Sequence, residues 1–72
     1  DYDGALQEFS AYDKILPGNP NTIFFEGFAY EGMQNYKQSA QQDQRYLQIT
    51  QQGDYAQHAY RRLREWQGKG IL

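Results

Sequence analysis

The stretch PNTIFFEGFAYEGMQNYKQS, residues 20–39, decides the fold of this 72-residue chain. Apolar and small residues recur at helical spacing from Ile23 to Tyr30 and predict one helix. Gly32, followed by Gln34 and Asn35, suits a tight turn into the next helix, which starts near Tyr36. Two helices joined by so short a turn must run antiparallel.

The helical spacing continues on both sides of this stretch. On the N-terminal side, a helix over 1–16 is predicted from an apolar stripe made of Tyr2, Ala5, Leu6, Phe9, Tyr12, Ile15 and Leu16. The run PGNP at 17–20 ends that helix. On the C-terminal side, a third helix ends before Gly53, and a fourth over 54–67 has an apolar face made of Tyr55, Ala59, Leu63 and Trp66. No segment alternates like a strand, so the chain is predicted to be all-α, with about four helices.

The ends of these helices carry recognisable capping residues. Ser, Thr, Asp and Asn are preferred at helix N-caps because their side chains accept a hydrogen bond from the first turn. We therefore expect Asn21 or Thr22 to cap the second helix and Asp54 to cap the fourth.

The chain also repeats itself at a distance of 34 residues. This shift brings Tyr2 onto Tyr36, Ala5 onto Ser39, Leu6 onto Ala40 and Tyr12 onto Tyr46, while Phe9 falls on Asp43 and breaks the pattern. A period of this length, built from paired helices, is typical of helical repeat proteins.

These residues resemble the tetratricopeptide-repeat family. Tyr2-x-x-Ala5-x-x-x-Phe9, followed by Pro17, resembles the second helix of a repeat and its terminating proline. Gly27-x-x-Tyr30 and then Asn35-Tyr36-x-x-Ser39 resemble the first helix, the turn and the second helix of the next repeat. The resemblance implies a right-handed solenoid fragment of antiparallel helix pairs: a second helix over 1–16, one full repeat over 20–53 and a capping helix over 54–67.

The resemblance also assigns packing roles. Gly27 would let two helices approach closely, and Ser39 would be the small residue opposite. Glu26 and Asp43 depart from the family, which has bulky apolar residues there, and should weaken the core locally. The final helix would pack onto the helix that carries Tyr36, Tyr46 and Leu47.

The function implied is binding of a protein or peptide. In the family, the first helix of each repeat lines a concave groove, and the groove residues carried over to this chain are Asn21, Phe24, Phe28 and Glu31. Because three neighbouring phenylalanines cannot share one narrow stripe, at least one of Phe24, Phe25 and Phe28 should turn away from the core. Self-association and binding to the rest of a parent chain are further possibilities.

Other functions are disfavoured by composition. Seven basic and nine acidic residues give a net charge of −2, which offers no attraction to nucleic acid. No apolar run has the length of a membrane span. With no cysteine and the single histidine His58, no metal site, cofactor or catalytic constellation is predicted, so the chain is not expected to be an enzyme. The run Arg61-Arg62-x-Arg64 is expected to be a solvated helix face, with binding of a carboxylate or phosphate as the alternative.

A looser resemblance supplies an alternative. Phe24-Phe25-Glu26-Gly27 and the stretch 56–63, AQHAYRRL, are similar to helical repeats that follow the catalytic part of some bacterial zinc metalloproteases. This would make the chain a non-catalytic C-terminal segment of a secreted or periplasmic enzyme, with the zinc motif ahead of Asp1. The sequence is compatible with either a periplasmic or a cytoplasmic location.

Overall fold

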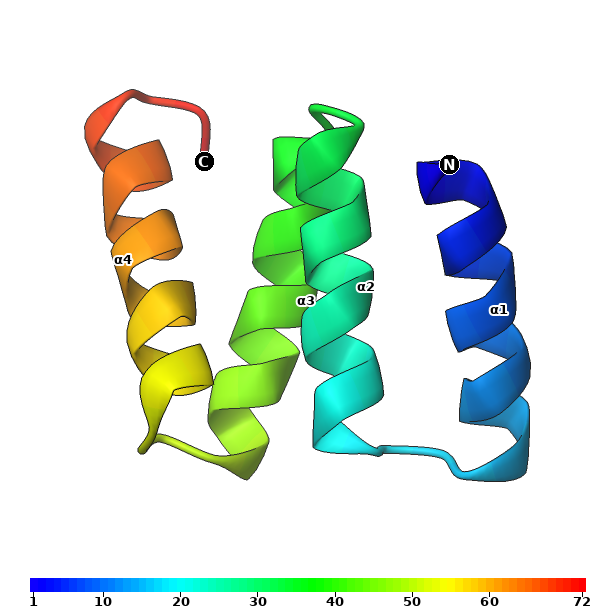
Figure 1. The fold of residues 1–72 in the computed structure, drawn as a ribbon. Helices are drawn as coiled ribbons and strands as arrows, with labels where there is room; N and C mark the ends of the chain where they lie inside the picture. Colours follow the sequence, from blue (N-terminus) through cyan, green and yellow to red (C-terminus); the bar gives the residue numbers. More distant parts are fainter.

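The computed structural model describes residues 1–72 as four helices: α1 (Tyr2–Ile15), α2 (Pro20–Gly32), α3 (Tyr36–Ile49) and α4 (Asp54–Gly68). Successive helices run antiparallel, with α2 and α3 in the middle and α1 and α4 at the two edges (Figure 1). The prediction of an all-α chain with four helices is therefore confirmed. None of the four helices combines the length and the hydropathy that crossing a bilayer requires.

Two of the predicted caps are wrong. Helix α2 is capped by Asn19, whose side chain accepts a hydrogen bond of 2.9 Å from the backbone N–H of Asn21. Pro20 then occupies the first helical position, where its missing N–H costs nothing and its ring already sets a helical φ. Helix α4 is preceded by Gly53 at φ 102°, so Asp54 is its first residue and not its cap.

The turn between α2 and α3 is closed by Gln34, which adopts a left-handed φ of 62°. The backbone N–H of Asn35 then donates to the carbonyl of Tyr30 at 2.8 Å, a bond characteristic of helix C-terminal caps. Gly32 has a different role: a Cβ at this position would overlap the ring of Tyr2. The glycine thus lets the beginning of α1 lie against the end of α2.

Helices α2 and α3 come close together at Gly27. A Cβ there would lie 3.0 Å from Oδ1 of Asp43 and 3.6 Å from the carbonyl oxygen of Ser39. The hydroxyl of Ser39 donates a buried hydrogen bond of 2.7 Å to the carbonyl of Gly27. The predicted close approach of two helices at Gly27 and the small residue at Ser39 are both confirmed.

The core lies between α2, α3 and α4. It consists of Ile23, Phe24, Tyr46 and Ala56, with Leu47 packed against it. Towards the other end of α4, the buried Trp66 lies against Tyr36 with ring centroids 5.4 Å apart. Helix α4 therefore packs onto α3 as predicted.

Tyr55 departs from the predicted packing of α4. Its ring is stacked on Phe24 of α2, with centroids 4.4 Å apart and an interplanar angle of 9°. Helix α4 therefore rests on α2 as well as on α3.

Helix α1 contributes no buried residue. The second half of its predicted apolar stripe is open to solvent, with Tyr12, Ile15 and Leu16 all exposed. An edge helix that packs on one neighbour can bury only the side chains on that side. The apolar pattern of α1 was correct, but only part of it is covered.

Candidate functional site

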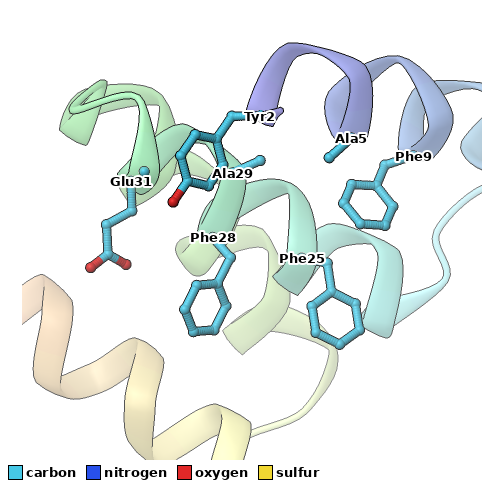
Figure 2. A pocket seen from close by; sticks show the side chains of 8 residues that line it. Tyr2, Ala5, Phe9, Phe25, Phe28, Ala29 and Glu31 are labelled. Carbon is cyan, nitrogen blue, oxygen red and sulfur yellow. The ribbon is translucent and has the colours of Figure 1, made fainter.

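An open cleft of about 360 Å³ lies between α1 and α2. It is lined by Tyr2, Ala5 and Phe9 from α1 and by Phe25, Phe28, Ala29, Glu31 and Gly32 from α2. Figure 2 shows Phe9 opposite Phe25, while Phe28 and Glu31 point towards α4. The walls are mostly apolar, and Glu31 provides the single ionisable carboxylate in them.

Aromatic rings extend this cleft across three helices. The rings of Phe9 and Phe25 are stacked 6.0 Å apart, and Phe25 meets Tyr55 of α4 edge-on at 5.8 Å. Phe28 is stacked on His58 of α4 at 5.0 Å. We call this set the aromatic strip; it consists of Phe9, Phe25, Phe28, Tyr55 and His58.

The strip exists because α2 cannot bury all its phenylalanines. Phe24 points inwards, is 2% exposed and touches Tyr46, Tyr55 and His58. Phe25 and Phe28 lie on the outer side, and Phe28 is 44% exposed. At least one of the three turns away from the core, as predicted. The result is a solvent-exposed apolar surface that lies over the buried ring of Phe24.

A polar cluster lies beside the strip and joins α2 to α4. Nη2 of Arg62 is 2.7 Å from Oε2 of Glu31, and Nε of Arg62 donates to Nε2 of His58 at 3.4 Å. Burial and the positive charge of Arg62 lower the pKa of His58, which fits a neutral imidazole accepting at Nε2. Arg62 is therefore not part of a solvated face, whereas Arg61 and Arg64 are exposed as predicted.

Asp43 lies behind this cluster, at the contact between α3 and α2. It is 4% exposed. Burial, reinforced by the negative charge of Glu31 and opposed by Arg62, raises the pKa of the Asp43 carboxyl to about 7. A carboxyl that keeps its proton about half of the time at neutral pH is more easily tolerated than a permanent charge where an apolar residue was expected.

The titratable groups near the strip are covered or paired with one another. Asp43 is covered by the α2–α3 contact, Glu31 and Arg62 neutralise one another, and no three His, Asp or Glu side chains are placed to hold a metal ion. Glu26, the other departure from the repeat pattern, is half-buried elsewhere on α2, where burial and then Asp13 raise its pKa.

Only two of the four predicted groove residues line the cleft. Phe28 and Glu31 line the cleft together. Phe24 is buried beneath the strip, so its assignment as a ligand-contacting residue is corrected: its own ring packing leaves it no free face. Asn21 is exposed in the first turn of α2, and its backbone N–H serves the Asn19 cap, outside the cleft.

Sequence reasoning did not select Tyr2 or Phe9 as surface residues, and it named Phe25 only as one of three phenylalanines of which at least one turns away from the core. Tyr2 and Phe9 belong to an apolar pattern that was interpreted as packing, and periodicity does not distinguish a covered apolar face from an open one. The signal that was available is the position of Tyr2 and Phe9 on an edge helix.

No protein-family model, curated protein or solved structure matches this chain. The fold and the surface define an all-α domain in which four helices pack in sequence and expose an aromatic strip beside an apolar cleft.

Proposed function

We propose that this domain is a protein-interaction module, a short tetratricopeptide-like solenoid that binds a segment of another protein through the aromatic strip and the α1–α2 cleft. The observation that carries the proposal is the set of aromatic ring contacts that spans α1, α2 and α4, in which Phe25, Phe28 and Tyr55 are exposed and Phe9 and His58 are half-buried. Contiguous apolar surface on a small domain marks an interaction site more often than chance exposure. Aromatic residues are also the side chains most enriched at the centres of protein interfaces.

The internal period supports the solenoid part of this proposal. A shift of 34 residues relates most apolar positions of α1 to apolar or small residues of α3, with Phe9 on Asp43 as the exception, and it relates Pro20, the first residue of α2, to Asp54, the first residue of α4. In a solenoid, each helix pair contacts its neighbours and presents one continuous surface. The close contact of Gly27 with Ser39 is the feature that such a helix pair needs at its crossing.

The proposed role is binding without catalysis. The strip has no free nucleophile and no acid–base pair, because His58 is engaged by Arg62, and Glu31 is paired with the same arginine. What the surface provides is rigid apolar area, which is a means of recognition.

Selection from a random peptide library displayed on phage tests this proposal. We expect immobilised wild-type domain to enrich peptides whose affinity falls by about tenfold or more in Phe28→Asp. The matched control is Tyr60→Asp, because Tyr60 is 40% exposed on α4 and Phe28 is 44% exposed. Circular dichroism must show that both variants stay folded. Failure to enrich any peptide, or equal losses in both variants, would refute the proposed surface.

A further inference from the structure

We propose that mild acid releases α4 from α2, because the contact between these two helices depends on a neutral His58. The device consists of His58 and Arg62 on α4 and the residues of α2 that they touch. A hydrogen bond, an ion pair, two ring contacts and the charges around the imidazole lead to it.

The hydrogen bond between Arg62 and His58 exists only while the imidazole is neutral. Nε of Arg62 donates to Nε2 of His58 at 3.4 Å. Nε2 can accept only when it carries no proton, so the single ring proton is on Nδ1. A second proton would turn this acceptor into a donor that faces the N–H of a guanidinium. Two donors that are both positively charged repel one another, so the contact is lost.

Arg62 is also the charged link between α4 and α2. Its Nη2 lies 2.7 Å from Oε2 of Glu31, and no other ion pair joins two helices of this chain. The other ion pairs, which Arg62 and Lys69 make with Glu65, lie within α4. His58 holds the Nε side of the guanidinium while Glu31 holds its Nη2 side. Loss of the imidazole acceptor therefore removes a support of the ion pair that crosses to α2.

The imidazole itself lies against α2. It is stacked on Phe28 with centroids 5.0 Å apart, and it meets Phe24 edge-on at 5.6 Å. Phe24 is 2% exposed, so one side of the imidazole faces the core. A charged ring loses hydration in such a contact, whereas the ring on a detached α4 is solvated. Uptake of a proton by His58 thus favours the state in which α4 has moved away.

The charged groups around His58 do not reverse this preference. On α4, Arg62 and Arg61 repel an imidazolium; on α2, Glu31 attracts it, but this carboxylate is already paired with Arg62. Asp43 of α3 interacts with Glu31 and Arg62. Burial is the largest effect on the ring, and together with the arginines it lowers the pKa of His58.

Docking of α4 therefore weakens as the pH falls. His58 has a lower pKa in the docked state than on a detached α4, where the ordinary value of 6.5 applies. The docked state is fully favoured above that value and loses stability as the pH falls from 6.5 through the lowered pKa. Because Tyr55 and His58 are the α4 members of the aromatic strip, release of α4 also divides the strip.

A proton NMR titration combined with amide hydrogen exchange tests this proposal. His58 is the only histidine, so its ring signals are unambiguous, and we expect their midpoint below 6.5. After correction for intrinsic rates, exchange of α4 amides should be faster at about pH 5 than at about pH 7.5. The increase should reach at most about tenfold for each pH unit between the midpoint and 6.5. Amides of α2 and α3 near Gly27 should not accelerate, because a protonated Asp43 stabilises that contact.

Variants assign the effect to the imidazole. His58→Gln keeps an acceptor for Arg62 but does not titrate, so acid should no longer accelerate exchange in α4. Asp43→Asn removes the other group that titrates in this range and should leave the acid effect in place. Arg62→Gln removes the repulsion, so it should raise the midpoint of His58 and reduce the acid effect. Arg61→Gln is its matched control: it removes the same charge from an exposed position and should change both much less.

Three results would overturn the proposal. A midpoint of His58 at or above 6.5 would mean that docking does not disfavour the charged ring, and this measurement needs no variant. Equal acceleration in α3 and α4 would mean that acid unfolds the whole chain. An acid effect that survives in His58→Gln would belong to another group. None of these measurements uses a ligand, so their outcome does not depend on the proposed binding function.

Discussion

The buried carboxyl of Asp43 should make the stability of this domain fall as the pH rises from about 4 to about 7. The replacement Asp43→Asn keeps the size of the side chain and removes its charge. In the folded chain the pKa of Asp43 is raised from 3.8 to about 7, first by burial and then by Glu31. Between these two values the folded state holds a proton that the unfolded state has released, so stability is lost as pH increases.

The size of the effect follows from the same pKa. Each tenfold change in proton affinity is worth about 1.4 kcal/mol, so complete ionisation of Asp43 costs at most about 4 kcal/mol. The attraction of Arg62 is already included in this pKa, and local relaxation that lets water reach the charged carboxylate lowers the cost further. We therefore expect Asp43→Asn to be more stable than the wild type by about 1–3 kcal/mol at pH values above 8, and to lose this advantage near pH 4.

Urea denaturation at a series of pH values measures this difference. Trp66 is the only tryptophan and is buried, so its fluorescence should report global unfolding. Taking the difference between variant and wild type removes most contributions from other titrating groups. Glu8→Gln is the control, because Glu8 is exposed and its replacement should give a nearly constant difference. A stability difference for Asp43→Asn that does not change with pH would refute this account of the α2–α3 contact.

Three further substitutions test other contacts. Gly27→Leu should cost at least about 1–3 kcal/mol, because even a Cβ at this position would lie 3.0 Å from Oδ1 of Asp43; the melting temperature measures this. Trp66→Ala should cost about 3–5 kcal/mol, enough to unfold much of so small a domain at low concentration, as seen by circular dichroism. Arg62→Gln should raise the pKa of His58, since the positive charge that lowers it is gone; a proton NMR titration of the ring follows this.

The first two of these have a control in the chain. Gly68→Leu introduces a side chain where a Cβ meets nothing within 4 Å, so it should cost much less than Gly27→Leu. Tyr60→Ala removes an exposed ring from the same helix as Trp66 and should be nearly neutral. A Trp66→Ala variant that remains a stable monomer would mean that this ring is not part of the core. An unchanged pKa of His58 in Arg62→Gln would show that the charge of Arg62 does not lower it.

Much of the fold could be predicted because its causes are local. The run PGNP at 17–20 ends the first helix because proline and glycine disfavour its continuation. Helical spacing identified the apolar faces of all four helices. The contact at Gly27 was predicted from the resemblance to a helical repeat, in which a residue without a side chain lets the two helices cross closely. The N-cap at Asn19 was missed because Asn19, Asn21 and Thr22 could each accept a hydrogen bond from the first turn of α2. Pro20 decides between them, because proline is favoured at the first helical position and so makes the residue before it the cap.

The sequence by itself determined which residues are apolar and at what spacing, and therefore that four amphipathic helices form. Only the tertiary structure decided which of those apolar faces are covered. Phe24 and Phe28 are four residues apart on α2, a spacing that usually places two side chains on one face, yet Phe24 lies in the core and Phe28 remains open. The physical reason is that burial depends on the neighbours a helix has: α4 covers Phe24 with Tyr55, whereas no helix of this chain fills the cleft beside Phe28.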